Sequence, residues 1–416
     1  MAPAVAPARQ KCSMKHFDYS FGMEEEFFLS RADTGALAID LARPLLEEAR
    51  RELGDRVTSE MLQSQIEIAS PIFGHVEEAH YEMGRLRWAL GQIAACLGLN
   101  IVAAGTHPLG VWQEQLIADE LRYEQLMADF RIIGHRNLVC GLHVHVSVPS
   151  CVDRVELMNR VMRWLPLLLA LSTSSPFWNA RITGLLSYRQ ALYDEWPRSG
   201  IPDFFENEAD YAAFTERMTR AGAIRDSSDL WWAIRPALRY PTLELRIADS
   251  CTHIGDSVAI AALFRCLVAA TVRHPRFGTR QTTHTRRIID ENRWRAKRDG
   301  IHAQFIAEAS SDVRSVAQVL DDALAFVADE THNLQCVRAV EGLKGILHRG
   351  TSAHRQLRIY NERRAAGLNR PDALRQVLAW LETATLEKPS VEMQLGLAPH
   401  EPTAGATNLS PDTVDG

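Results

Sequence analysis

Seven ionisable side chains with the chemistry of a cation or phosphate site occur on four short segments in which apolar and polar residues alternate. Successive residues of a β-strand point to opposite faces, so the alternation predicts four strands, each with one apolar and one polar face. The segments span residues 21–29, 62–69, 142–148 and 241–248, and their polar faces carry Glu24, Glu26, Glu67, His143, His145, Glu244 and Arg246. An antiparallel sheet with one face in water would explain the alternation too. Such a face usually carries Lys, Thr and Ser, whereas this set is mainly carboxylate and imidazole.

A cleft formed by these polar faces would hold four carboxylates against one guanidinium. Crowded carboxylates raise one another's pKa unless cations lie between them. Oxygen-rich ligand sets favour Mg²⁺ or Mn²⁺, although the histidines would also suit Zn²⁺. Mg²⁺ usually joins protein carboxylates to substrate phosphates, which points to ATP. The chain has no GxxxxGK[ST] P-loop and no convincing GxGxxG, so metals and cationic side chains would have to hold the nucleotide.

Helical periodicity accounts for most of the remaining chain. Apolar residues recur at helical spacing in six segments, which are residues 76–97, 153–171, 256–272, 312–328, 334–347 and 372–381, and residues 351–364 are expected to form a further, polar helix. Strands that lie far apart in the sequence and alternate with long helices predict an α+β fold with helices on one side of a sheet. We expect a single domain over residues 16–389, between disordered tails at 1–15 and 390–416.

Composition excludes several classes of partner. The 416 residues include 46 Lys and Arg against 52 Asp and Glu, a net charge of −6 that does not suit binding to nucleic acid or anionic lipid. The basic run at 286–298 is then better explained as a solvated helix face than as a nucleic-acid patch. The apolar stretches at 165–171 and 258–272 are too short or too interrupted for a membrane span. Seven cysteines without a CxxC pair, and no secretory signal, predict reduced thiols and a cytoplasmic location.

Eight blocks, in order, resemble one known family. They are FGMEEEFFL (21–29), EMLQSQIEIASP (60–71), GTHP (105–108), CGLHVHVSVP (140–149), SSPFWNARITGLLSYR (174–189), YPTLELRIAD (240–249), ENRWRAKRDG (291–300) and GTSAHRQLRIY (350–360). This pattern is similar to that of the bacterial carboxylate–amine ligases, the glutamate–cysteine ligase type 2 family. The resemblance implies a glutamine-synthetase-like catalytic domain with a mainly antiparallel curved sheet. It also implies ATP- and Mg²⁺-dependent joining of a carboxylate, expected to be L-glutamate, to an amine such as L-cysteine or another amino acid.

The resemblance also implies roles for individual residues. The expected metal ligands are Glu24, Glu26, Glu67, His143 and Glu244, with Glu60 a weaker candidate. The expected substrate contacts are Arg189, Arg246, Arg235 and Tyr188, of which Arg189 and Arg246 would anchor the substrate carboxylate as catalytic residues. His145 and Arg355 are the candidates for nucleotide contacts. For the basic run at 286–298, the resemblance favours contacts with phosphate or between segments near the site. Glu25 points to the apolar face of its strand and is expected to be structural or to end in a salt bridge.

Some alternatives stay open at this point. Glu244 and Arg246 could form a structural ion pair, and Tyr188 could be a packing residue. A zinc-dependent hydrolase or a non-catalytic nucleotide- or amino-acid-binding protein would use the same residue types. Residues 190–210, which include Trp196, Pro197, Gly200 and Pro202, are the candidate for a mobile loop that covers the site. The identity of the amine is open, and the family suggests a homodimer.

Overall fold

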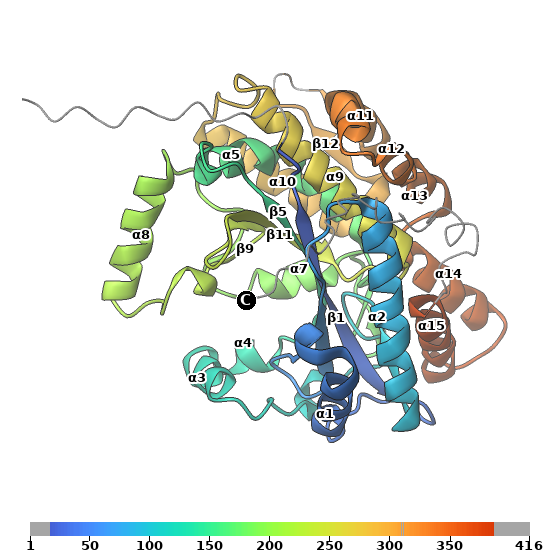
Figure 1. Ribbon diagram of the computed structural model, residues 1–416. Helices are drawn as coiled ribbons and strands as arrows, with labels where there is room; N and C mark the ends of the chain where they lie inside the picture. The colour runs from blue at the N-terminus through green and yellow to red at the C-terminus, as the bar shows by residue number, and fades with distance from the viewer. Residues whose placement is uncertain (1–16, 309, 311, 387–416) are drawn as a thin grey trace, which may run out of the picture.

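The computed structural model describes residues 17–308, 310 and 312–386, and a seven-stranded sheet lies at its centre (Figure 1). The strand order is β10-β11-β5-β1-β3-β2, with β4 also paired to β1, and every pairing in the sheet is antiparallel. The strands are β1 (Phe21–Arg31), β2 (Val57–Ser59), β3 (Gln65–Ala69), β4 (Leu99–Val102), β5 (Gly141–Ser147), β10 (Ile234–Pro236) and β11 (Thr242–Asp249). All four predicted strands are present, and the α+β fold with an antiparallel sheet is confirmed. Both predicted tails lie outside the described residues, and the single domain stays a prediction.

Long helices pack on the apolar face of this sheet. Met23 and Phe27 of β1 and Val144 of β5 belong to one buried cluster with side chains of the helices that cover this face. These helices are α2 (Val76–Cys96), α5 (Arg154–Val161), α6 (Leu165–Ser172) and α9 (Ile254–Arg273). The opposite face is bordered by α1 (Ala42–Leu53), α3 (Leu121–Phe130) and α7 (Tyr188–Tyr193). The sheet therefore separates an apolar core from a polar hollow.

Two predicted helices are each divided in the structure. The segment predicted at 153–171 is α5, a 3₁₀ turn at Met162–Trp164 and then α6, in whose first turn Pro166 is tolerated because its missing N–H has no helical partner there. The segment predicted at 334–347 divides at Gly342 into α12 (Val337–Glu341) and α13 (Leu343–Arg349). The segment predicted at 312–328 begins with a strand, β13 (Val313–Ser315), and continues as α11 (Val316–Asn333).

The remaining helices are α4 (Ile132–His135), α8 (Glu208–Arg220), α10 (Thr283–Asp299), α14 (Ser352–Ala365) and α15 (Arg370–Thr385). The remaining strands form three two-stranded pairings and are β6 (Phe177–Trp178), β7 (Arg181–Ile182), β8 (Ser199–Gly200), β9 (Trp231–Trp232) and β12 (Gln304–Ile306), which pairs with β13. Among the described residues, α9 is the one helix whose length and hydropathy would suit a membrane span, and 89% of its apolar window is buried inside the protein.

A buried ion pair crosses the apolar side of the sheet. Glu25 of β1 is 1% exposed and accepts two hydrogen bonds from Arg87 of α2, at 2.7 and 2.8 Å. The same guanidinium donates to the carbonyl oxygens of Cys251 and Thr252. The predicted salt bridge of Glu25 is thus confirmed, and both buried charges are compensated, as burial in a core requires.

Candidate functional site

A cavity of about 580 Å³ lies over the polar face of the sheet. The seven ionisable residues on the polar faces of the four predicted strands all line it, together with Glu60 and Arg235. Strands that are up to 220 residues apart in the chain are thus brought to one cavity, from Glu24 on β1 to Glu244 on β11. The placement fits the predicted cleft. The catalytic and ligand roles of these residues stay predictions.

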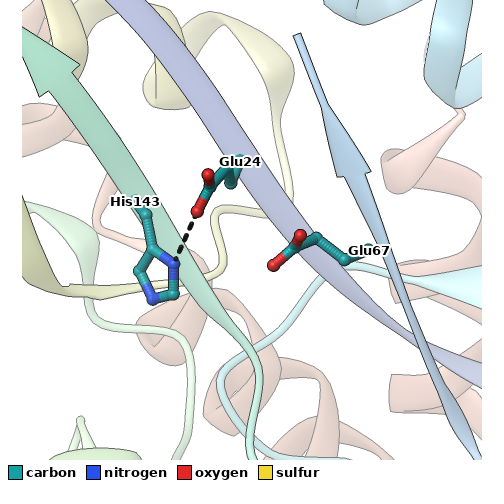
Figure 2. Close-up of side chains that lie close together, drawn as sticks. All are labelled: Glu24, Glu67 and His143. Carbon is teal, nitrogen blue, oxygen red and sulfur yellow. Dashed lines mark hydrogen bonds and ion pairs between the residues drawn. The ribbon is translucent and has the colours of Figure 1, made fainter. Parts of the chain in front are cut away.

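Strand register explains why these side chains meet. Residues directly opposite in an antiparallel pair project to the same face, with Cβ atoms about 5 Å apart. Glu24 lies opposite His143, Glu26 lies opposite Glu67, and His145 lies opposite Glu244. Figure 2 shows Glu24, Glu67 and His143 converging from three adjacent strands.

Two overlapping groups of side chains could hold a cation. Glu24, Glu67 and His143 form one group, and Glu26, Glu60 and Glu67 form the other. Within each group, one ligand atom of every residue lies within 4.8 Å of those of the other two. Glu67 belongs to both groups, so two neighbouring cations could share it. Glu60, the weaker candidate in the sequence, has a place equal to that of Glu26.

The electrostatics of these groups fit a hard divalent cation. Burial, followed by the charge of Glu24, raises the pKa of Glu67 well above its usual range, and burial with the charge of Glu26 raises the pKa of Glu60 to about 8. Ionisation of both carboxylates at once is therefore unfavourable, and a bound cation between them would offset their repulsion. His143 Nε2 is buried and has no hydrogen-bond partner among the described residues. The donor sets contain at most one histidine and no cysteine, which suits Mg²⁺ or Mn²⁺ better than Zn²⁺.

Glu24 is the carboxylate that the histidines stabilise. Its Oε2 lies 3.3 Å from His143 Nδ1 and its Oε1 lies 3.4 Å from His145 Nε2. Although burial opposes ionisation, hydrogen bonds from both imidazoles lower the pKa of Glu24 well below its usual range. Burial and nearby Arg246 lower the pKa of His143. His145 also contacts Thr242 at 3.2 Å, which orients its ring beside β11.

Glu244 lies outside both cation groups. Arg235 Nε donates to its Oε2 at 2.7 Å, and Arg246 Nη1 donates to its Oε1 at 2.5 Å. Against the effect of burial, these two guanidinium groups lower the pKa of Glu244. The structure thus places Glu244 in the ion pair that the sequence left open, and not among the grouped metal-ligand candidates. Two arginines already compensate its charge, and its role as a metal ligand stays a prediction.

Three further predicted residues do not line the cavity, so the structure gives no support to their expected contacts. Arg189 is fully buried, and its guanidinium donates to backbone carbonyl oxygens of β11. Tyr188 packs against Trp178, with ring centroids 5.6 Å apart, as the packing alternative expects. Arg355 is exposed on α14 and is not part of the cavity lining. The strand period fixes a face, but a loop or short helix such as 174–193 gives no comparable rule, so the sequence could not orient Arg189 or Tyr188.

The cavity also contains residues that the sequence did not single out. Arg50 and Arg122 add cationic groups from α1 and α3, and Tyr193 at the end of α7 lines the wall beside Arg246. Arg239 comes from the connection between β10 and β11. Tyr193 lies one helical turn after Arg189, in the segment already linked to the site, and this spacing is the signal that could have identified it.

The predicted covering segment is tied to helix α10. Asp194 forms ion pairs with Arg293, at 2.7 Å, and with Lys297. Arg286 pairs with Asp203 and donates to the carbonyl oxygens of Ile201 and Pro202. The basic run at 286–298 therefore provides contacts between segments, one of the explanations considered above. These ion pairs anchor the 190–210 segment at Asp194 and at Asp203.

The family of the chain follows from comparison with known sequences. The sequence model of the glutamate–cysteine ligase family 2 (GCS2) matches residues 20–373. The chain belongs to this family. A relative from Ectopseudomonas mendocina, named "Putative glutamate--cysteine ligase 2", is 42% identical over 374 residues, which is 90% of this chain and 99% of the relative. A Bradyrhizobium diazoefficiens protein of the same name is 42% identical over 84% of this chain and 81% of its own length.

Solved structures share the fold of this family member at low sequence identity. The glutamate–cysteine ligase of Francisella tularensis, solved in complex with AMP, has a TM-score of 0.62 at 13% identity and is covered over 91% of its length, with 90% of this chain aligned. The bifunctional glutathione synthetase of Pasteurella multocida has a TM-score of 0.65 at 15% identity. This chain aligns over 88% of its own length but spans only 52% of that bifunctional protein. These likenesses bear out the predicted ligase-type fold.

Proposed function

We propose that this protein is an ATP- and Mg²⁺-dependent carboxylate–amine ligase that forms a γ-glutamyl amide through an acyl phosphate. The observation that carries the proposal is the two clusters of candidate cation ligands that share Glu67. They lie inside a cavity that also contains several arginines. A magnesium–triphosphate complex has complementary charges to such a cavity. Membership of the glutamate–cysteine ligase family 2 supports the same reaction class.

The cation sites would be formed by side chains already close together. Glu24, Glu67 and His143 would hold one Mg²⁺, and Glu26, Glu60 and Glu67 would hold a second. When bound, Mg²⁺ would neutralise the charge that develops on the transferring phosphoryl group. Mn²⁺ could take the same ligands because it also prefers oxygen donors.

Arg246 is the residue best placed to hold the substrate carboxylate. Its side chain is 11% exposed, it lines the cavity, and its Nε is buried without a hydrogen-bond partner among the described residues. One guanidinium edge is used by Glu244, which fixes the orientation of the group. The planar fork can then bind a carboxylate in a fixed direction, which a lysine could not do.

The reaction would proceed in two displacements. An oxygen of the substrate carboxylate attacks the γ-phosphorus of ATP, and ADP leaves, giving an acyl phosphate. The amine nitrogen then attacks the carbonyl carbon, the bond from that carbon to the phosphate oxygen breaks, inorganic phosphate leaves, and the amine loses a proton. The protein supplies positioning and charge compensation in place of a covalent nucleophile. Exclusion of water from the acyl phosphate would fall to the aromatic wall that includes Tyr193 and Trp196.

The test is ADP release by the purified protein with ATP, Mg²⁺ and L-glutamate, with each of a panel of amines, followed by mass spectrometry of the product. We expect ADP release that depends on both the carboxylate and the amine, with L-cysteine the first amine to examine. Glu24→Gln is the inactive control. ADP release without amide formation, or hydrolysis that needs zinc and no ATP, would refute the proposal. A cytoplasmic location and a homodimer are further proposals, which fractionation and light scattering would test.

A further inference from the structure

The floor of the cavity contains a β-bulge at Arg246. Leu245 pairs with Val144 and Ala248 pairs with Leu142, so Arg246 and Ile247 together lie opposite one residue of β5. A bulge bends its strand, redirects side chains and interrupts the ladder hydrogen bonds. The direction of the Arg246 side chain therefore depends on what stabilises this irregular backbone.

Two adjacent residues of α7 satisfy the carbonyl groups of the bulge. Arg189 Nη1 and Nη2 each lie 3.3 Å from the carbonyl oxygen of Arg246, and Nη1 lies 3.4 Å from that of Ile247. Gln190 Nε2 donates to the same Ile247 oxygen at 2.8 Å. Arg189 is 0% exposed, so its guanidinium has no access to a substrate in the cavity.

The same guanidinium lies against Gly141 at the start of β5. A Cβ atom at residue 141 would lie 2.2 Å from Arg189 Nη2, so any residue other than glycine would displace the guanidinium. The Gly141 N–H donates to Glu26 Oε2 at 2.6 Å and so holds a candidate cation ligand. Arg189 therefore touches the backbone that carries Arg246 and the backbone that orients Glu26.

Arg189 is itself fixed by a buried network. Its backbone N–H donates to Ser175 Oγ at 3.1 Å, and Ser175 Oγ donates to Asp249 Oδ2 at 2.7 Å. Ser187 Oγ donates to the other oxygen of Asp249 at 2.8 Å. The Arg189 guanidinium also stacks on the ring of Tyr193, at 4.7 Å from the centroid. The start of α7 is thus locked to the end of β11.

We propose that Arg189, with Gln190, is a positioning pair that stabilises the bulge of β11 and directs Arg246 and Glu26 into the cavity. It acts without touching substrate, in contrast to the substrate-anchoring role expected from the sequence. The part of the proposal that concerns the substrate carboxylate rests on the proposed function. The part that concerns Glu26 and a cation can be measured without turnover.

The first test compares Arg189→Lys with Arg265→Lys. Arg265 is a matched control because it is also buried, donates to the backbone carbonyls of Asp18, Tyr19 and Gly74, and lies over an aromatic ring, yet it does not line the cavity. Both variants should lose stability in chemical denaturation. Only Arg189→Lys should weaken Mn²⁺ binding in the absence of nucleotide, and raise KM for the carboxylate substrate, each by about 10-fold or more. Equal losses of Mn²⁺ affinity in both variants, or unchanged Mn²⁺ affinity in Arg189→Lys, would overturn the positioning role.

The second test is a double-mutant cycle between Gly141→Ala and Arg189→Lys. Gly141→Ala alone should weaken Mn²⁺ binding because the new Cβ displaces the guanidinium, whereas in the Arg189→Lys background the Nη2 atom that lies nearest to the Cβ is gone and the effect should be smaller. Additive effects would contradict a shared mechanism, as would a crystal structure of Arg189→Lys in which the bulge, Arg246 and Glu26 are unmoved. The Mn²⁺ and crystallographic measurements decide this inference even if the wild-type protein shows no ligase activity.

Discussion

Neighbouring glutamates on the two faces of β1 differ in how their charges are compensated. Glu25 points to the helix-covered face, where Arg87 compensates its charge through two hydrogen bonds. Glu24 and Glu26 point to the cavity, where further carboxylates from β3 and the preceding loop crowd around them. On the covered face the charges balance within the protein, whereas on the cavity face an excess of negative charge remains for a ligand to neutralise. Burial alone does not distinguish a functional carboxylate, but the lack of a compensating charge does.

The largest expected effect comes from removing the charge of Glu25 on the helix-covered face. Glu25→Gln leaves the Arg87 guanidinium buried without its counter-charge, and should lower the free energy of unfolding by about 3–5 kcal/mol. Urea denaturation followed by circular dichroism would measure this loss. Activity of the folded fraction should persist, because the pair does not line the cavity. An unchanged unfolding midpoint would show that the pair contributes little to stability.

The corresponding change on the cavity face should affect activity more than stability. Glu67→Gln removes the carboxylate shared by the two cation groups, and should reduce kcat/KM by about 10²–10³-fold. Because the change relieves crowding among ionised carboxylates, the metal-free variant should unfold at a temperature equal to or above that of the wild type. Steady-state ADP release and thermal denaturation in EDTA are the two measurements. A variant with full activity would remove Glu67 from the proposed site.

A smaller effect is expected from a change at Arg246, which pairs with Glu244 and is the proposed contact for the substrate carboxylate. Arg246→Lys keeps a cation beside Glu244 but loses the planar fork, and should raise KM for the carboxylate substrate by about 10-fold with a smaller change in kcat. Arg235→Lys is the comparison, because the Arg235 guanidinium is already occupied by Glu244 and two backbone carbonyl groups. Equal KM increases in both variants would indicate that Glu244, and not a direct substrate contact, explains the effect.

The smallest effect is a pH dependence that the cavity face alone should show. Burial and the charge of Glu26 raise the pKa of Glu60 from 4.5 to about 8. A pKa raised in the folded state gives stability that is complete below pH 4.5 and is lost as the pH rises through 8. The melting temperature of the metal-free protein should therefore fall across this range by a few degrees more than that of Glu60→Gln. Added Mg²⁺ should abolish the difference, and identical profiles in EDTA would refute the assignment.

The sequence alone determined which residues share the cavity face. The two-residue period of a strand placed Glu24, Glu26, Glu67, His143 and His145 on polar faces, and a buried face cannot change register without exposing its apolar side chains. The same rule separated Glu25 from its neighbours. This information is local, so it could be read before any coordinates were known.

Only the tertiary structure decided which charged groups pair with one another. Register and loop paths set Arg235 and Arg246 against Glu244 and brought Glu60 to Glu67. They also brought Arg189 to the bulge of β11. None of these contacts follows from a periodic pattern, because each joins segments whose relative placement depends on packing of the whole core. Local periodicity fixes the face of a strand, whereas the pairing of charges depends on distances of a few ångströms that only the folded chain sets.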